Sequence, residues 1–137
     1  MFSPEFTNCF SDARLDTRVK QMLEELCNRP QHSVRQISND RSSQMGWYRF
    51  LNNDKTSEEK IISRISESCN ERISHRIVLC IQDTTEINLY SHRRRIKEDE
   101  FIGPMSHKEY GLGFFIHPGY VIDAISGFPY GFSHIQM

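Results

Sequence analysis

The spacing of apolar residues changes character near Arg76. Before this residue, apolar side chains recur at intervals of three and four residues, the pattern of amphipathic helices. After it, apolar residues come in short runs or alternate with polar ones, and most of the glycines lie there, which is typical of β-strands. We therefore predict an α+β fold, with a helical domain over residues 6–76 and a strand-rich domain over residues 77–137.

Four helices are predicted in the first part. The first carries the stripe Leu15, Val19 and Met22, with Ser11 as its cap and Pro30 just beyond its end. Within the third, Tyr48, Phe50 and Leu51 are expected to pack in the core. The fourth begins at a capping box, a hydroxyl followed three residues later by a glutamate. The expected ranges are 12–28, 33–38, about 42–51, and 56 onward.

Three strands are predicted in the second part, at 77–82, 111–123 and 128–137. The first is apolar on both faces, so we expect a central, buried strand. The charged stretch between the first two strands is expected to be a solvated loop. Because the sequence stops inside a strand-like segment, the second domain is expected to be incomplete. The alternative is that the helices cover one face of the sheet and a homodimer interface covers the other.

Asp83 is the sharpest candidate for chemistry. It follows the first predicted strand directly, on the face shared by that strand's odd-numbered apolar residues, so the strand holds its carboxylate rigidly. Mg²⁺ prefers such oxygen ligands but needs more than one of them. Asp123, at the end of the second strand, is the acidic residue expected to approach. The alternative is an Asx turn, in which Asp83 accepts bonds from the amides of Thr85 or Glu86.

The overall composition limits the possible functions. The 137 residues carry 17 basic and 18 acidic side chains, a net charge of -1, which excludes a polybasic tail as the main feature. No apolar run reaches the roughly 20 residues of a membrane helix, and the N-terminus lacks the pattern of a secretory signal. The four cysteines and six histidines show no metal-site spacing. Local basic and aromatic clusters remain, either as solvated helix faces or as phosphate contacts.

Four segments follow one another along the chain: D-A-R-L-D-T-R at 12–18, Y-R-F-L-N-N at 48–53, I-Q-D-T-T-E at 81–86, and 111–123 with G-F-P-Y-G at 127–131. In this order they resemble the N-terminal part of the DDE transposases of the insertion-sequence-four type, relatives of the Tn-five transposase. In that family a helical DNA-binding domain precedes a ribonuclease-H-like catalytic domain, of which this chain is expected to contain the first three antiparallel strands.

The resemblance implies that Asp83 is the first catalytic carboxylate and a Mg²⁺ ligand, with Thr84 and Thr85 shaping the turn that aims it. It also implies a prokaryotic, cytoplasmic, nucleoid-associated protein that binds transposon ends, with a homodimer on the DNA. The second Asp and the Glu lie further along in complete members, so this chain alone is expected to be inactive. The DNA-contact candidates are Arg14, Arg18, Arg35, Arg49 and Asn52.

Two other functions fit the same residues. One is a truncated, non-catalytic protein that binds DNA and inhibits transposition. The other is a small α+β dimeric domain without any DNA function. Sequence-specific DNA binding with a steep salt dependence separates the first from the second.

Overall fold

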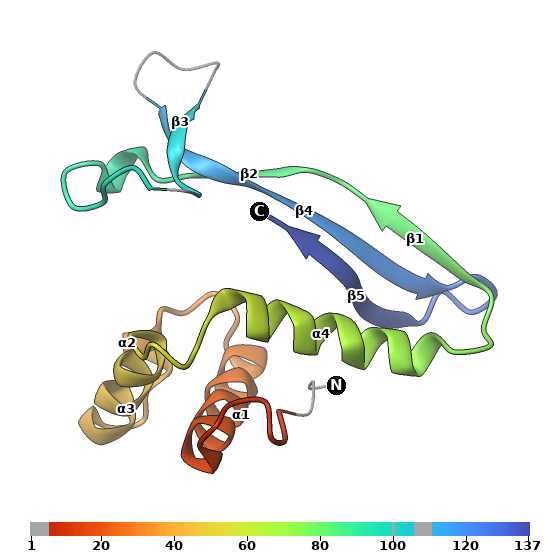
Figure 1. The fold of residues 1–137 in the computed structure, drawn as a ribbon, viewed down its shortest axis with the longest axis horizontal. Helices are drawn as coiled ribbons and strands as arrows, with labels where there is room; N and C mark the ends of the chain where they lie inside the picture. Colours follow the sequence, from red (N-terminus) through yellow and green to blue (C-terminus); the bar gives the residue numbers. More distant parts are fainter. Residues whose placement is uncertain (1–5, 100, 106–110) are drawn as a thin grey trace. The chain divides into compact units, whose positions relative to one another are not determined.

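The computed structural model describes residues 6–99, 101–105 and 111–137. The chain divides into two compact units, Met1–Ser68 and Cys69–Met137, and each is described by itself. The first unit is helical and the second is built around an antiparallel sheet, so the α+β class is confirmed (Figure 1). The domain limits at residues 76 and 77 stay a prediction.

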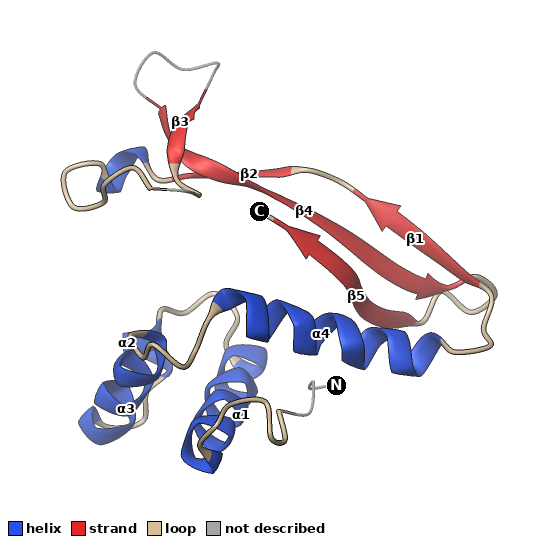
Figure 2. Cartoon of the chain, viewed as in Figure 1, coloured by secondary structure: helices blue, strands red, loops and turns tan. Residues whose placement is uncertain are grey.

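The four predicted helices are present in the described residues (Figure 2). Their ends lie within a few residues of the expected ones. None of the helices in this part of the chain is long and apolar enough to cross a bilayer. The helices are α1 (Ala13–Asn28), α2 (Val34–Ile37), α3 (Arg41–Leu51) and α4 (Glu58–Ile73).

The caps of two helices differ from the prediction by one residue. The Asp12 carboxylate, rather than the Ser11 hydroxyl, accepts the amide of Arg14 at 2.9 Å and begins α1. Ser57, rather than Thr56, accepts the first bonds of α4. The Thr56 hydroxyl instead donates to the carbonyls of Phe50 (2.5 Å) and Asn53 (2.8 Å). Thr56 therefore adds a side-chain donor to two carbonyls near the end of α3, which also accept the amides of Asn53 and of Thr56 itself.

One apolar core closes the helical unit, with Phe50 fully buried as predicted. The Phe10 ring meets the Phe50 ring edge to face, with centroids 5.4 Å apart. Tyr48 and Leu51 were expected in this core, and that expectation is wrong: they are 44% and 51% exposed. Trp47 and Phe50 define the buried side of α3, and Tyr48 and Leu51 lie outside it. The core residues are Phe6, Phe10, Leu15, Val19, Met22, Ile37, Trp47 and Phe50.

The segment ahead of α1 belongs to the same core. The two carboxylate oxygens of Asp16 accept the amides of Asn8 and Phe10, each at 3.0 Å. Asn8 takes a left-handed conformation (φ 57°), which asparagine tolerates better than most residues. This clamp holds the segment so that Phe6 and Phe10 are buried.

The sheet of the second unit is organised around β4. Because Gly113 pairs with both Asn88 and Gly103, β2 and β3 lie on opposite edges of β4. Gly119 likewise pairs with β1 on one edge and with β5 on the other (Figure 1). The elements are β1 (Val78–Gln82), β2 (Thr85–Asn88), the 3₁₀ turn η1 (Tyr90–His92), β3 (Gly103–Met105), β4 (Gly111–Asp123) and β5 (Pro129–Gln136).

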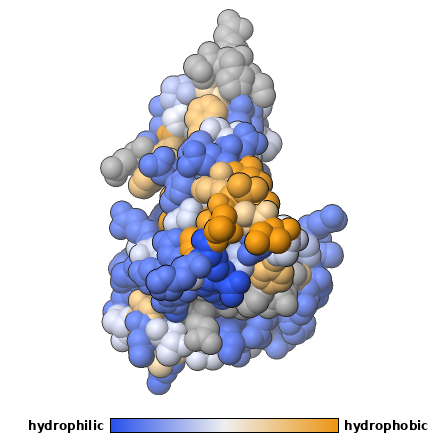
Figure 3. All heavy atoms as spheres, turned by 90° about the vertical axis from the view of Figure 1, so that its right-hand side faces the viewer, coloured by the Kyte–Doolittle hydropathy of each residue, from blue (hydrophilic) through white to orange (hydrophobic). Residues whose placement is uncertain are grey.

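The three predicted strands are confirmed as β1, β4 and β5, with two corrections. The stretch expected to be a loop contains the short strands β2 and β3. In addition, β1 is not buried or central: among the described residues it pairs only with β4, and Ile77, Leu79 and Ile81 are 76%, 53% and 51% exposed. An apolar strand is buried only where another layer covers its faces. Figure 3 shows apolar side chains gathered at the surface on the face that it views.

Candidate nucleic-acid interface and carboxylate site

The solvent side of α3 carries a line of exposed side chains, most of them polar or aromatic. Arg41, Met45, Tyr48 and Asn52 follow one another at intervals of four, three and four residues, so they share one side of the helix. All four are exposed, as is Arg49 beside them. These five residues are called the α3 face. Arginine and asparagine donate hydrogen bonds to phosphates and base edges, and tyrosine adds an aromatic surface.

Arg49 and Asn52 were predicted from the sequence to be DNA contacts, and the structure places both on the α3 face. Arg41 was not predicted. The sequence does contain a sign of it, because Arg41 lies seven residues, or about two helical turns, before Tyr48 and so falls on the same side of the helix. This spacing identifies an exposed side of the helix only when the buried side is known, and the burial of Trp47 and Phe50 defines that side.

Arg18 lies against α3 rather than on the α3 face. A Cβ on Gly46 would sit 3.4 Å from the Arg18 Nε, at ordinary contact distance, so the guanidinium lies next to the glycine. Arg18 is half-buried there, and Gly46 is buried. Arg14 lies one turn earlier on the same side of α1 and is exposed. Arg18 therefore packs beside α3, Arg14 is exposed, and the DNA contacts predicted for both stay predictions.

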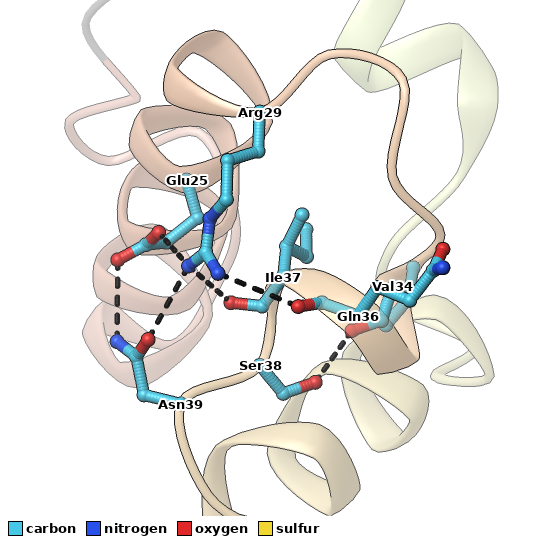
Figure 4. Close-up of polar contacts among 7 residues, drawn as sticks. All are labelled: Glu25, Arg29, Val34, Gln36, Ile37, Ser38 and Asn39. Atoms are coloured by element: carbon cyan, nitrogen blue, oxygen red, sulfur yellow. Dashed lines mark hydrogen bonds and ion pairs between the residues drawn. The ribbon is translucent and has the colours of Figure 1, made fainter.

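Arg29 ties α1 to the end of α2 (Figure 4). Its guanidinium donates to the Ile37 carbonyl at 2.8 Å, the Gln36 carbonyl at 3.4 Å and the Glu25 carboxylate at 2.5 Å. The Asn39 side chain accepts a hydrogen bond from Arg29 and donates one to Glu25. The hydrogen bond from Arg29 lowers the pKa of Glu25 below its usual value. Arg29 therefore satisfies carbonyls at the end of α2 that have no helical partner.

Arg35 lies on α2 itself and is exposed. Its predicted DNA contact stays a prediction. The structural role of Arg29 could not be predicted from the sequence, because its partners at the end of α2 are backbone carbonyls. Only the ion pair between Arg29 and Glu25, four residues apart on one helix, could be predicted from the sequence.

The helical unit also contains a polar cavity of about 390 Å³ between the N-terminal segment and α4. Its cations are engaged within the chain: Arg64 pairs with Glu67 at 3.3 Å, and the Lys60 ammonium donates to the Lys55 carbonyl at 3.1 Å. The Cys9 thiol at its rim has a raised pKa, chiefly because of burial. We do not include this cavity in the candidate interface.

In the second unit, Asp83 directly follows β1, as predicted, and its side chain is exposed. Its Oδ1 accepts the amide of Thr84 at 2.8 Å. Thr85 begins β2 opposite Ile116, and the Asx turn onto the amides of Thr85 or Glu86 stays a prediction. Thr84 is exposed and separates Asp83 from that strand.

Asp123 does not approach Asp83, so that expectation is wrong. In the antiparallel register Asp123 pairs with Val78, five residues before Asp83, or about 16 Å away along the strand. Its carboxylate holds the β4–β5 turn instead, accepting the Ser126 amide at 2.8 Å, the Ile125 amide at 3.1 Å and the Tyr130 hydroxyl at 3.1 Å. These bonds, led by that from the Ser126 amide, lower the Asp123 pKa to about 2.

Asp99 and Glu86 are two further acids of this unit. Asp99 accepts the amides of Phe101 and Ile102, which lowers its pKa, and Glu86 falls on the opposite face of the edge strand. Within the described residues, no three His, Cys, Asp or Glu side chains are grouped as a metal site. Asp83 thus offers one hard oxygen ligand, suited to Mg²⁺ but short of a complete donor set.

Comparison with known proteins connects the helical unit to a family. Residues 3–56 match the model of the transposase DNA-binding family. The matched range includes α1, α2 and the whole α3 face. No curated protein matches the chain. Residues 3–56 are therefore similar to a transposase DNA-binding domain.

Proposed function

We propose that the chain is the N-terminal part of a DDE transposase of the insertion-sequence-four type and that the α3 face binds transposon-end DNA. The observation that carries this proposal is the exposed line of Arg41, Tyr48 and Asn52, with Arg49 beside it, inside the matched residues. Its width of about one helix face suits a DNA groove. Arg14 and Arg35 are exposed and add phosphate contacts.

The net charge of -1 restricts how this interface binds. Without a basic tail, phosphate neutralisation comes from the few arginines named above. We therefore expect a salt dependence that reflects a small number of phosphate contacts. Discrimination between sequences then depends on Arg49 and Asn52, because their planar donors can form paired hydrogen bonds with base edges.

In the second unit, we propose Asp83 as the first metal-binding carboxylate of a ribonuclease-H-like domain. Its exposed oxygens are the hard ligands that Mg²⁺ prefers, and Thr84 and Thr85 set the chain direction beside it. The chemistry that Mg²⁺ supplies when bound is activation of a water or 3′-hydroxyl and neutralisation of the leaving oxygen. Among the residues that the structure describes, no three-residue group of His, Cys, Asp or Glu includes Asp83.

The DNA proposal is tested by selection from a random double-stranded DNA pool with the full chain. We expect a preferred sequence to emerge and Arg49→Ala or Asn52→Ala to weaken its binding about tenfold. Arg14→Ala, which removes a proposed phosphate contact, should lower the salt slope by about one. Lys20→Ala is the matched control, since Lys20 is exposed on a different side of α1 from Arg14 and Arg18. Equal binding by all variants would remove the α3 face from the interface.

A dimeric domain without DNA function is the second candidate, favoured by the exposed apolar residues of β1. The same selection separates the two. Failure to enrich any sequence, together with a concentration-dependent dimer in sedimentation, supports the second candidate and rejects the first. Dimerisation with enriched DNA supports a dimer on the transposon end.

A further inference from the structure

The edge of the sheet beside Asp83 contains a gap. Both β1 and β2 lie along the same edge of β4 in one continuous register, from Val78 opposite Asp123 to Asn88 opposite Gly113. Pairing nevertheless stops after Gln82 and resumes at Thr85. Continuing the register across the gap places Asp83 opposite Pro118, and Thr84 opposite His117.

The proline explains the gap. The amide of Ala124 donates to the Ile77 carbonyl at 3.0 Å, and that of Leu89 donates to the Leu112 carbonyl at 2.7 Å. In an antiparallel ladder hydrogen-bonded pairs occur at every second residue, so the odd-numbered residues from 77 to 89 take this role. Asp83 is one of them. Because Pro118 has no N–H, it cannot donate the expected bond to the Asp83 carbonyl.

A side-chain bond spans the same gap. Residues of a non-hydrogen-bonded pair bring their side chains closest together, and Thr84 opposite His117 is such a pair. The Thr84 hydroxyl and the His117 Nδ1 are 2.8 Å apart. The Thr84 amide, in turn, donates to the Asp83 carboxylate at 2.8 Å. Thr84 thus connects a ring on β4 to the carboxylate at the end of β1.

A second histidine extends this polar row on the same side. A Cβ on Gly119 would lie 2.2 Å from the Cε1 of His134, so only glycine leaves room for the ring. The His134 ring nitrogens lie 3.3 Å from the Gln82 amide and 3.2 Å from the Ser133 hydroxyl. The ring centroids of His117 and His134 are 6.4 Å apart. The row therefore holds both sides of the gap in place.

We propose that His117 is a positioning residue for Asp83, acting through the Thr84 hydroxyl. It replaces, with a side-chain bond, the backbone bond that Pro118 cannot make, and so fixes Thr84, whose amide orients the Asp83 carboxylate. The metal-related part of this inference rests on the proposed function of Asp83. The orientation of the carboxylate is measurable without any metal.

The test is NMR of the full ¹⁵N-labelled chain. Thr84→Val removes the hydroxyl at constant shape, whereas Thr84→Ser keeps it. We expect Thr84→Val and His117→Ala to accelerate hydrogen exchange of the residue-84 amide at least tenfold. Thr84→Ser, and His117→Asn with its amide near the place of Nδ1, should restore most of the protection. Unchanged exchange in Thr84→Val and His117→Ala would overturn the positioning role.

Metal binding is read from the same samples with Mn²⁺ as the probe. We expect Mn²⁺ to broaden the signals of residues 82–85, Asp83→Asn to abolish this broadening, and Thr84→Val to reduce it several-fold. Broadening that survives Asp83→Asn, or is absent in the wild type, rejects Asp83 as the ligand. The exchange result then decides the positioning role alone. Unchanged signals of β4 and β5 in each variant verify that the sheet is folded.

Discussion

The two units of the chain differ in how far their apolar side chains are buried. In the helical unit, amphipathic stripes on α1 and α3 meet and close a core that contains Val19, Ile37 and Phe50 almost without exposure. In the sheet unit, Ile77, Leu79 and Ile81 are as apolar in sequence but stay more than half exposed. A helix needs cover on one stripe, whereas a strand that is apolar on both faces needs a layer on each. The apolar composition of an element therefore predicts its burial only when the number of other elements that can cover its faces is also known.

The largest test of this comparison is Phe50→Ala. Truncation of a fully buried aromatic ring is expected to cost about 3–5 kcal/mol in the free energy of unfolding. Residue-resolved hydrogen exchange should show the loss across α1, α2 and α3. Leu51→Ala is the control. The Leu51 side chain is next to Phe50 in the sequence but exposed, so its truncation should change the free energy of unfolding by less than about 0.5 kcal/mol. Equal effects at the two positions would mean that α3 buries a different side.

The next effect in size is that of Arg29→Ala. It removes hydrogen bonds from a charged donor to the carbonyls of Gln36 and Ile37, and we expect a loss of about 1–2 kcal/mol. Thermal unfolding followed by the fluorescence of Trp47 in the core measures it. Arg35→Ala provides the matched control on an exposed arginine. A wild-type midpoint for Arg29→Ala would show that water replaces the guanidinium without cost.

A smaller, local effect concerns pH and the turn after β4. The folded pKa of Asp123 is lowered to about 2 from an ordinary 3.8, so its stabilisation of the turn is present above pH of about 4 and lost as the pH falls toward 2. A ¹³C titration of the carboxyl should give the low midpoint, and the amide of Ser126 should shift with it. Asp123→Asn should abolish that shift, while a midpoint near 4 would show that the turn does not hold the carboxylate.

The smallest effect sharpens the contrast most directly. Leu79→Ser and Ile81→Ser are expected to change the free energy of unfolding by less than about 0.5 kcal/mol, because both side chains are exposed. Val121→Ala, in the centre of the same sheet, should cost about 1.5 kcal/mol or more. Chemical denaturation of the three variants compares them. If the serine variants cost as much as Val121→Ala, another surface covers β1 in solution.

The helices and the main strands could be predicted because their signals are local. Intervals of three and four residues fix helices, and the run at 77–82 fixes a strand, whatever lies around them. The buried side of α3 was harder, because Trp47, Tyr48, Phe50 and Leu51 are all apolar or aromatic and only the positions of α1 and α2 decide among them. The short strand β2 was missed because its polar sequence carries little strand signal.

The candidate site was predictable to a similar extent. Asp83 stands where the end of the strand places it, but the place of Asp123 depends on the antiparallel register, which pairs it with Val78 and which no local pattern contains. The roles of Arg18 and Arg29 were hidden for the same reason. Their partners are a buried glycine and backbone carbonyls, so their sequence context resembles that of an exposed, ligand-binding arginine.

The carboxylate of Asp16 has a practical consequence for handling the domain. By holding the amides of Asn8 and Phe10, it makes the segment ahead of α1 an integral part of the fold rather than a dispensable leader. A fusion joint or protease site placed between Phe6 and α1 would separate two aromatic rings from the core. Affinity tags at this end therefore belong upstream of Phe6, and resistance to proteolysis between residues 6 and 12 is a convenient assay of a correctly folded preparation.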